Sequence, residues 1–266
     1  MITAAEYDDV LQINLCRYPE MMPALTVSAY LVDGLLIDTG PAHTAKELVQ
    51  FLEDRELDKV VNTHHHEDHI GANKLLQEQR GIEIFAHSLA VEKIGLPAVL
   101  YPYQEEVWGY PVPSIVKPLG TRIGTKKYMF EIVHTPGHDR DCICLLERKS
   151  GLLFSGDLFL GSKPSACRPM EDCRRIIKDL KLVQSLRPRL IFSALGSVIA
   201  DPKERLEKVV GNLKNLGRRI HDLHAQGLNP TEIRQRIFGE ESPMAPRTQF
   251  QFSSENLVKS FLNGDH

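Results

Sequence analysis

The chain has 266 residues, of which 42% are hydrophobic, 25% charged and 7% aromatic. These values are typical of a globular protein with a substantial core, and they exclude disordered, collagen-like and disulfide-scaffold proteins. The 32 Lys and Arg residues are balanced by 35 Asp and Glu, so the net charge is −3 and no overall positive field favours nucleic acid or an anionic membrane. No apolar run is long enough to span a bilayer.

The start of the chain and its cysteines indicate a cytoplasmic protein. Residues Met1 to Asp9 contain acids and lack the basic start and the apolar stretch of a secretory signal. Five cysteines are an odd number in a long chain, which favours reduced thiols over a disulfide framework. We therefore expect a cytoplasmic location.

The first two-thirds of the chain alternate short apolar runs with helical patterns. Apolar runs bounded by turn residues predict strands, and Asp33-Gly34 is a strong hairpin signal between two of them. The predicted strands are Val10–Leu15, Leu25–Val32, Leu35–Ile37, Val60–Val61, Ile82–Phe85, Tyr128–His134, Cys142–Leu146, Leu152–Ser155 and Arg189–Ser193. The predicted helices are Pro41–Leu52, Asp68–Gln79 and Met170–Leu186. This interleaving indicates an α/β protein with helices packed over sheets.

One segment interrupts the alternation. Residues 94–118 are rich in proline and aromatic side chains, and aromatic side chains need a surface to pack on. Long connections without their own periodicity are commonly functional lids or linkers. We expect a lid-like insertion here that either covers the edge of the core or faces a substrate.

The last part of the chain is predicted to be helical. Apolar residues recur there in steps of three and four and form a narrow seam on one long helix: Leu206, Val209, Leu213, Leu216, Ile220 and Leu223. Two shorter helices follow at Pro230–Phe238 and Ser254–Leu262. We therefore divide the chain into a main domain, residues 1–200, and a C-terminal helical extension, residues 201–266. The seam is expected to cover the main domain, with a homodimer contact as the alternative.

The most informative stretch is Thr63-His64-His65-His66-Glu67-Asp68-His69, which follows a predicted strand and enters a predicted helix. Residues two apart in an extended chain face the same side, so His64 and His66 point together. Asp68 and His69 fall at the helix start, where the chain turns back towards the same point. Three imidazoles and a carboxylate that converge in this way suit a borderline metal such as zinc. A purification tag is excluded because tags lie at chain ends.

Two further candidate ligands follow later strands. His138 lies directly after the Pro136-Gly137 turn, and Asp157 comes directly after Gly156. Loops at the ends of different strands can meet at one edge of a sheet. Both side chains are therefore candidates to complete a metal site with the histidine cluster.

The complete pattern resembles the metallo-β-lactamase superfamily of metallohydrolases. The motifs that carry the resemblance are His64-x-His66-x-Asp68-His69, Gly137-His138, Gly156-Asp157 and the early turn Ile37-Asp38-Thr39-Gly40, which in the family supports the metal loops. The similarity covers roughly the first two hundred residues. It implies a four-layer αββα sandwich, so that residues 1–200 would be the catalytic domain, with the site along one sheet edge.

The resemblance also implies a ligand set. Residues His64, His66 and His138 would hold a first metal ion. Asp68 and His69 would belong to a second site, and Asp157 would bridge the two.

One position departs from the family. After the strand that ends near Phe192 the family usually supplies a final histidine, and Leu195 stands there in this chain. Leucine cannot bind a metal, so we expect one firmly bound Zn²⁺ and a second site that is weakened or absent, with Fe or Mn as alternative metals. Three other histidines are candidates to replace the missing ligand: His43, His221 and His224. Each of them is, however, expected to be a surface residue.

These features predict a metal-dependent hydrolase. A metal ion held by three imidazoles lowers the pKa of a bound water from 15.7 to about 7. Asp68 is placed to orient that water and to carry its proton to the leaving group. We predict hydrolysis of an ester, thioester or lactone-like bond in a small-molecule substrate.

Three alternatives remain open. A related group of the superfamily uses a single iron to oxidise glutathione persulfide, and a lost second site fits such an oxidoreductase. Other relatives cut RNA, and the stretch from Pro202 to Phe238 has a local excess of basic residues, but the acidic balance of the whole chain argues against nucleic acid. A binding module with a decayed site is disfavoured because six ligand positions are intact.

Overall fold

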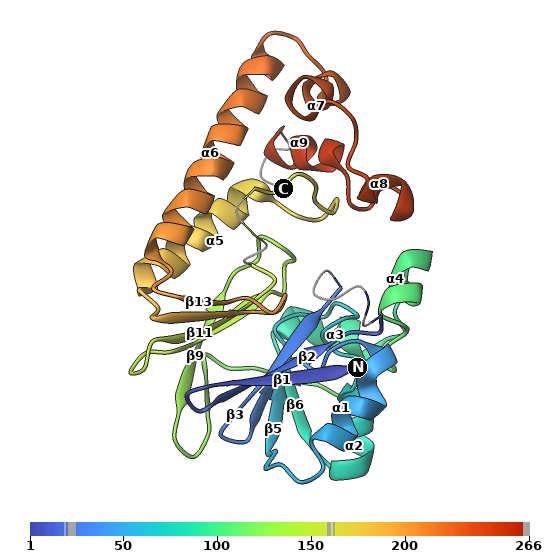
Figure 1. Cartoon of the computed structure of the whole chain (residues 1–266), viewed down its shortest axis with the longest axis vertical. Coiled ribbons are helices and arrows are strands. Elements are labelled where there is room, and N and C mark those ends of the chain that lie inside the picture. Colours follow the sequence, from blue (N-terminus) through green and yellow to red (C-terminus); the bar gives the residue numbers. More distant parts are fainter. Residues whose placement is uncertain (19, 21–24, 159–160, 162, 263–266) are drawn as a thin grey trace.

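The protein was analysed as a computed structural model that describes residues 1–266 except 19, 21–24, 159–160, 162 and 263–266. Within the described residues, two β-sheets lie face to face and helices cover both outer faces (Figure 1). This arrangement confirms the expected αββα sandwich.

The first sheet has seven strands in the described part of the chain, and they pair in sequence order. Pairing is antiparallel from β1 to β4 and parallel from β4 to β7. The hairpin between β3 and β4 forms as predicted, because Asp33 and Gly34 both have positive φ angles. The strands are β1 (Ile2–Tyr7), β2 (Val10–Leu15), β3 (Val27–Val32), β4 (Leu35–Ile37), β5 (Lys59–Val61), β6 (Glu83–Ala86) and β7 (Lys117–Pro118).

The second sheet has six strands among the described residues, in the order β13-β12-β11-β10-β9-β8. Its pairs are antiparallel except for β11 and β12, which are parallel and are connected through a helix. The strands are β8 (Arg122–Gly124), β9 (Met129–His134), β10 (Ile143–Glu147), β11 (Leu152–Gly156), β12 (Leu190–Ser193) and β13 (Val198–Ala200).

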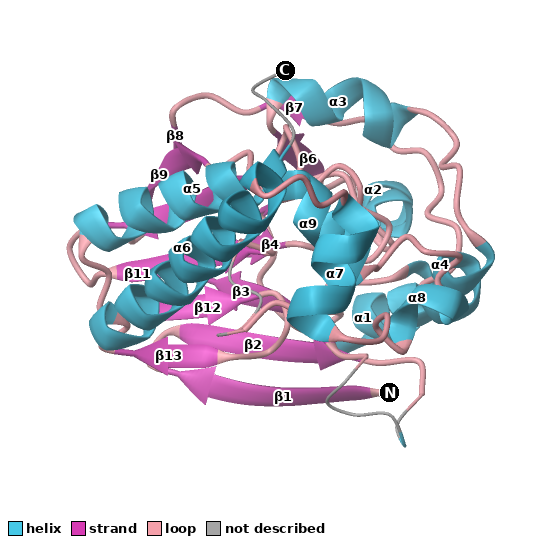
Figure 2. Cartoon of the chain, turned by 90° about the horizontal axis from the view of Figure 1, so that it is seen from above, coloured by secondary structure: helices cyan, strands magenta, loops and turns pink. Residues whose placement is uncertain are grey.

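Helices form the two outer layers (Figures 1 and 2). The helical elements that lie between β4 and β7 along the chain are a 3₁₀ turn, η2 (Ala42–Thr44), and α1 (Ala45–Phe51), α2 (Asn73–Arg80), α3 (Ser88–Gly95) and α4 (Pro102–Val107). The second sheet shares one hydrophobic core with α5 (Cys173–Leu186), α6 (Lys203–Ala225), α7 (Pro230–Phe238) and α9 (Ser254–Leu262), and the short helix α8 (Met244–Arg247) lies between α7 and α9 in the chain.

The core follows from the alternation of side chains along each strand. In β10, Ile143 and Leu145 join the cluster between the two sheets, whereas Cys144 and Leu146 join the cluster beneath the helices. Each central strand is therefore apolar on both faces, which explains its continuous hydrophobic sequence. Aromatic rings fill the space between the sheets, including the stacked pair Phe154 and Phe192.

The apolar seam of the long C-terminal helix is buried within the chain. Leu206, Val209, Leu213 and Ile220 belong to the same core as α5 and the second sheet, and α6 packs against α5 and α9. The seam therefore covers the main body of the protein, as expected. The division at residue 200 stays a prediction, since these helices share one core with the preceding part of the chain.

Several predicted boundaries were wrong. The helix after the histidine cluster begins at Asn73 rather than Asp68, because the backbone of His69 makes tertiary hydrogen bonds instead of helical ones: its carbonyl accepts from Thr39 N at 2.8 Å. The helix predicted from Met170 begins at Cys173, where the Asp172 side chain caps it. The helix predicted over Pro41–Leu52 divides into η2 and α1. The strands β1, β7, β8 and β13 and the helices α3, α4 and α8 were not predicted.

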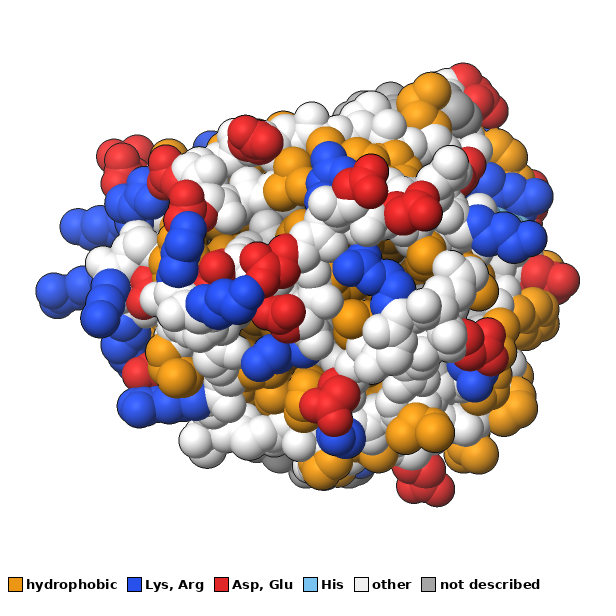
Figure 3. Space-filling view, turned by 90° about the horizontal axis from the view of Figure 1, so that it is seen from below, with side chains coloured by type: hydrophobic (Ala, Val, Ile, Leu, Met, Phe, Trp, Pro, Cys, Tyr) orange, Lys and Arg blue, Asp and Glu red, His pale blue; other side chains and the backbone are white. Residues whose placement is uncertain are grey.

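The surface carries charges of both signs. Seen from below, acidic and basic side chains are interspersed over most of the face, with basic ones gathered along one edge (Figure 3). None of the helices in the described part of the chain is long and apolar enough to cross a membrane.

Candidate metal centre

The candidate site lies where loops from both sheets meet. The loop after β5 carries the histidine cluster, the turn between β9 and β10 carries His138, and Asp157 follows β11. The backbone N–H of Ile143 in β10 donates to the carbonyl of Thr63 at 2.9 Å, so the loop of the first sheet is joined directly to the second sheet. The site therefore spans the edge of the sandwich.

Three histidines form the first group of possible ligands. The Nε2 atom of His64 lies 3.0 Å from Nδ1 of His66, and Nε2 of His138 lies 3.1 Å from the same atom. The ligand atoms of the three side chains all lie within 4.8 Å of one another. All three side chains are buried, so the structure brings together residues that are as much as 74 positions apart in the chain (138 minus 64).

A second group adjoins the first. It consists of His64, His69 and Asp157, whose ligand atoms also lie within 4.8 Å of one another. Asp157 Oδ1 lies 3.3 Å from Nε2 of His69, and its Oδ2 lies 3.4 Å from Nε2 of His138. Asp68 Oδ2 approaches Nε2 of His69 at 3.7 Å. Asp157 thus lies between the two groups with one oxygen turned to each.

The outward nitrogen of every histidine in these groups faces a polar group. Such outer partners fix the orientation and tautomer of a metal-binding imidazole. The pairs are His64 Nδ1 with Thr63 Oγ1 at 3.1 Å, His66 Nε2 with Asp139 Oδ2 at 3.5 Å, His69 Nδ1 with Asp38 Oδ2 at 2.8 Å, and His138 Nδ1 with Glu171 Oε1 at 3.7 Å. The other nitrogen of each ring is thereby directed to the shared centre.

The ionisation states of the side chains around the centre favour a bound cation. Burial, together with the neighbouring rings, holds the pKa of His64 and of His66 well below the ordinary value, so both rings are neutral and offer a lone pair. Burial also lowers the pKa of His69, but the carboxylates of Asp68, Asp38 and Asp157 outweigh it and raise that pKa well above the ordinary value. The same carboxylates would stabilise a metal ion.

Unpaired buried atoms support this fit. Asp68 Oδ1, His69 Nε2 and Asp157 Oδ1 are buried and have no hydrogen-bond partner among the described residues. A buried polar atom without a partner costs about 1–3 kcal/mol. Because these three atoms are all ligand types for zinc and related metals, the residues present fit a bound metal ion.

Leu195 lines a cavity that opens onto this centre, and the three substitute histidines do not. Leu195 lines the same cavity as Asp68 and Asp157, with 42% of its surface exposed. The ring of His43 makes hydrogen-bond contacts with Arg17 and with a backbone carbonyl of α4. Within the described residues, no group of possible ligands includes His43, His221 or His224.

A third group of possible ligands is explained by ion pairs. His65, His66 and Asp139 lie close together, but the ammonium of Lys93 is 3.0 Å from Asp139 Oδ1 and 3.4 Å from His65 Nδ1. His65 also pairs with Asp141 at 3.0 Å. Because the ammonium of Lys93 already balances the negative charge of Asp139, this group needs no metal ion.

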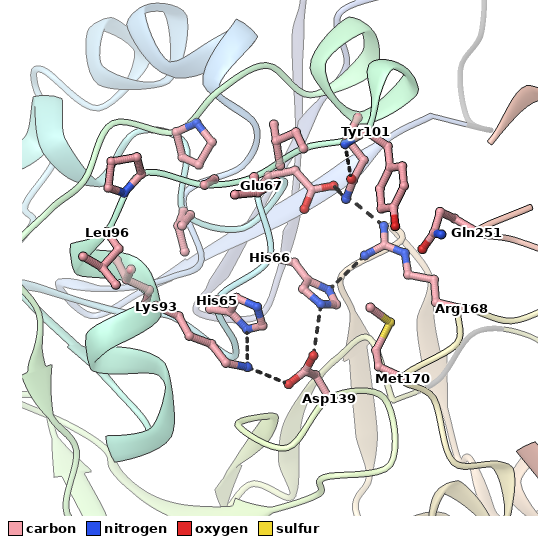
Figure 4. Close-up of a pocket in the computed structure, with 18 of the residues that line it drawn as sticks. His65, His66, Glu67, Lys93, Leu96, Tyr101, Asp139, Arg168, Met170 and Gln251 are labelled. Carbon is pink, nitrogen blue, oxygen red and sulfur yellow. Dashed lines mark hydrogen bonds and ion pairs between the residues drawn. The ribbon is translucent and has the colours of Figure 1, made fainter. Parts of the chain in front are cut away.

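Two cavities open onto the centre from different sides. One has a volume of roughly 340 Å³ and is lined by His66 together with apolar residues of the 94–118 segment (Figure 4). The other, of roughly 450 Å³, is lined by Asp68, His138 and Asp157. Tyr103 and Arg168 line both cavities.

Sequence reasoning missed three residues of the site: Asp139, Glu171 and Arg168. Asp139 directly follows His138, and an acid beside a candidate ligand histidine is a signal that could have been used. Glu171 and Arg168 lie in the connection before α5, and nothing in their local sequence marks them. Asp38 was expected to support the metal loops, and its hydrogen bonds to Thr63 and His69 have that geometry.

Comparison with known families agrees with this geometry. The family model described as "Metallo-beta-lactamase superfamily" matches residues 22–194, which is most of the chain. The chain belongs to the metallo-beta-lactamase superfamily, and it is an enzyme of the hydrolase class that this superfamily represents.

Individual relatives are distant. The "Beta-lactamase-like protein 2 homolog" of Drosophila melanogaster is 26% identical over 231 residues, which cover 83% of this chain and 75% of the relative. "Hydroxyacylglutathione hydrolase GloC" of Haemophilus influenzae is 29% identical over 186 residues, which cover 66% of this chain and 86% of the relative. A crystal structure of a metallo-beta-lactamase family protein from Thermus thermophilus shares the fold with a TM-score of 0.68 at 20% identity, covering 97% of this chain and 94% of that one.

Proposed function

We propose that this protein is a metal-dependent hydrolase of an ester, thioester or lactone-like bond in a small-molecule substrate. His64, His66 and His138 would hold the metal ion. The observation that carries the proposal is the convergence of their three inner nitrogens while every outer nitrogen faces a polar partner. That arrangement directs three imidazole nitrogens at one point beside the cavity that His138, Asp68 and Asp157 line.

A metal ion in this position supplies Lewis-acid polarisation of the scissile carbonyl and lowers the pKa of an attacking water. The Asp68 carboxylate faces the larger cavity, and its Oδ1 has no hydrogen-bond partner among the described residues. That oxygen can accept the proton of the attacking water and pass it to the leaving group. Burial raises the pKa of Asp68 to about 6, which suits a group that gains and loses a proton near neutral pH.

The metal would be Zn²⁺, with Fe or Mn as alternatives. Three imidazoles are a common zinc ligand set. Beside it, Asp68, His69 and Asp157 form an incomplete second site, because the side chain of Leu195 faces the same cavity and cannot bind a metal. We therefore propose one firmly bound ion and a second site that is weak or absent.

The substrate would lie against the 94–118 segment. Tyr103, Val107 and Trp108 of this segment line the cavity that contains Asp68. We propose that the segment is a substrate-facing lid. The name of the relative from Haemophilus influenzae includes hydroxyacylglutathione, a thioester, and this supports including thioesters in the substrate class. All five cysteines are free and buried, which supports a cytoplasmic location.

A second candidate is a mononuclear iron enzyme that oxidises a persulfide. Leu195 lines the same cavity as Asp68 and Asp157 and cannot bind a metal, which favours this candidate because such an enzyme requires a single-metal site. Elemental analysis of the purified protein together with oxygen uptake in the presence of glutathione persulfide separates the two candidates. Iron with uptake of dioxygen would replace the hydrolase proposal.

The test of the hydrolase proposal is reconstitution. Metal-free protein is loaded with Zn²⁺, Mn²⁺ or Fe²⁺ and assayed against a panel of esters, thioesters and lactones. We expect turnover with at least one metal, and we expect the His138→Ala variant to lose both the bound metal and the turnover. The absence of hydrolysis across the whole panel, with metal stoichiometrically bound, would contradict the proposal.

A further inference from the structure

A buried arginine stands at the edge of the three-histidine group. Arg168 is only 7% exposed, and its Nη1 atom lies 3.3 Å from Nδ1 of His66 (Figure 4). The side chain lines both cavities that open onto the centre. A cation here is unexpected, because the neighbouring site is itself built to bind a cation.

Few hydrogen-bond donors of the Arg168 guanidinium have a partner in the described part of the protein. It has five N–H donors, yet its only side-chain hydrogen bond to the described residues is the one to His66. The buried Nε atom has no partner among the described residues. The ion pair with Glu67 is 3.7 Å long, and the same carboxylate oxygen accepts from Gln104 Nε2 at 2.7 Å.

Metal binding would remove the one hydrogen bond that the Arg168 side chain makes to the described residues. Nδ1 of a neutral imidazole has a single lone pair, which either accepts a hydrogen bond or binds a metal. With His66 holding a metal, the guanidinium would remain buried with Glu67, 3.7 Å away, as its ion-pair partner. A buried charge is costly unless its hydrogen-bond donors are also satisfied, and a second anion would satisfy them.

The surrounding structure holds Arg168 in place. The guanidinium carbon lies 5.0 Å from the ring centroid of Phe252, a cation–π contact with the C-terminal part of the chain. The preceding residue, Cys167, forms a two-way backbone bridge with Ser253. The backbone N–H of Arg168 donates to Glu171 at 3.2 Å. These contacts fix a charge whose ion pair with Glu67 is 3.7 Å long.

We propose that Arg168 binds a carboxylate of the substrate, so that the enzyme acts on acyl esters or thioesters that carry a carboxylate close to the scissile carbonyl. This inference rests on the proposed hydrolase function. A planar carboxylate matches the paired N–H groups of a guanidinium, and a single arginine matches a single negative charge. The contact with His66 places the charge beside the bond that is cleaved.

The other cation of the smaller cavity is already paired. Lys93 is held by Asp139 at 3.0 Å and by Asp141 at 3.4 Å. The remaining wall of that cavity includes Ile94, Leu96 and Val112, which would accept an apolar part of the substrate. Of these two cations in the smaller cavity, Arg168 is therefore the one that can bind an anion.

The test compares two thioesters of the same shape. S-malonyl-N-acetylcysteamine carries a carboxylate where S-isovaleryl-N-acetylcysteamine carries an isopropyl group. The zinc-loaded wild-type enzyme is expected to prefer the malonyl thioester. In Arg168→Met we expect kcat/KM for the malonyl thioester to fall about 10- to 100-fold, mainly through KM, and that for the isovaleryl thioester to change less than about threefold. Arg168→Lys is expected to retain part of the preference, since it keeps the charge but not the planar fork.

A binding measurement gives an independent readout. Calorimetric titration of succinate into the zinc-loaded protein should show binding that Arg168→Met weakens by a similar factor and that Arg219→Met leaves unchanged. Arg219 is an exposed arginine of α6, so its variant controls for the loss of one positive charge. Equal losses for both thioesters in Arg168→Met, or unchanged succinate affinity, would overturn the inference. If the wild-type enzyme hydrolyses neither these thioesters nor any substrate of the ester, thioester and lactone panel while succinate binding still depends on Arg168, the hydrolase proposal fails and the anion site stands.

Discussion

Oδ2 of Asp38 lies 2.8 Å from Nδ1 of His69, and the same carboxylate accepts hydrogen bonds from the backbone N–H and the hydroxyl of Thr63 at 2.7 and 2.8 Å. One side chain on the turn after β4 thus positions both ends of the histidine loop after β5. The Nε2 atom of His69 is turned towards Asp157 as a result. The carboxylate is an outer support of the site and does not itself belong to a group of possible ligands.

Replacing this support should weaken metal binding. In Asp38→Asn the amide loses an acceptor towards His69 and Thr63, and we expect metal affinity to fall about 10- to 100-fold. Competition with a chromophoric chelator measures the change. Asp33→Asn is the control, because Asp33 lies in the turn between β3 and β4 and its hydrogen bonds are to Lys127 and Thr125, not to the histidine loop. Equal affinities of Asp38→Asn and wild type would show that this carboxylate does not orient the site.

Restoring a ligand at position 195 should change the metal content. Leu195 faces the cavity of Asp68 and Asp157 and is partly exposed, so Leu195→His is expected to fold normally. We expect the metal bound per chain, measured by mass spectrometry after equilibrium dialysis, to rise from one to two. Leu195→Met keeps the size and apolar character and should leave the count at one. Two ions in the wild-type protein would contradict this prediction.

The turn before His138 has no room for a side chain. A Cβ atom at Gly137 would lie 2.6 Å from the backbone nitrogen of Ile176 at the start of α5. We expect Gly137→Ala to shift the turn, to destabilise the fold by about 1–3 kcal/mol and to weaken metal binding through His138. Gly120→Ala is the matched control, because a Cβ there meets nothing within 4 Å. Urea denaturation and metal titration of both variants test the prediction, which fails if they behave alike.

Two glycines of α6 should respond in opposite ways to the same change. A Cβ at Gly211 meets nothing within 4 Å, and alanine is the better helix former, so Gly211→Ala is expected to stabilise the protein by about 0.5–1 kcal/mol. A Cβ at Gly217 would lie 2.9 Å from the ring of Phe261 in α9. We therefore expect Gly217→Ala to lower the melting temperature and Gly211→Ala to raise it. Calorimetry of the two variants checks the packing of α6 on α9.

A buried carboxylate should make stability depend on pH. Burial raises the pKa of Asp179 from 3.8 to about 6, although the hydrogen bond from Gly137 N and the nearby Arg175 and His134 partly oppose it. Between pH 4 and pH 6 the folded state holds this proton more tightly than the unfolded state. The contribution of Asp179 to stability is therefore lost as the pH rises through that range.

Asp179→Asn should remove this dependence while it retains an oxygen acceptor for Gly137. We expect its advantage in unfolding free energy over the wild type to grow from pH 4 to pH 6 and to reach about 1–3 kcal/mol. Urea denaturation of the metal-free proteins at several pH values measures the difference without interference from metal binding. A difference that does not change with pH would contradict the assignment.

Much of the candidate site could be predicted from the sequence. Only a few side-chain types bind metals, and four of the six candidates lie between His64 and His69. His138 and Asp157 follow predicted strands, where residues of different strands can meet. The αββα arrangement followed from the same motifs, and the buried strands were visible as continuous apolar runs such as Leu152–Ser155.

Local structure was predicted less well. Four strands were missed, and three of them, β7, β8 and β13, have too few residues for a periodic pattern. The loop from Thr63 to Ala72 was assigned in part to a helix, since local propensity does not reveal that the carbonyl of His69 is used by Thr39 and Asn62.

By itself the sequence determined the ligand candidates, the fold class and the amphipathic face of the long helix, because each depends on residue type and on short-range spacing. The tertiary structure decided which nitrogen of His66, His69 and His138 faces the centre, because Asp139, Asp38 and Glu171 reach those rings from other segments. It also placed Arg168 beside His66, 102 residues away in the chain. No local pattern encodes such a contact, since it forms only when the two sheets and the C-terminal helices pack together.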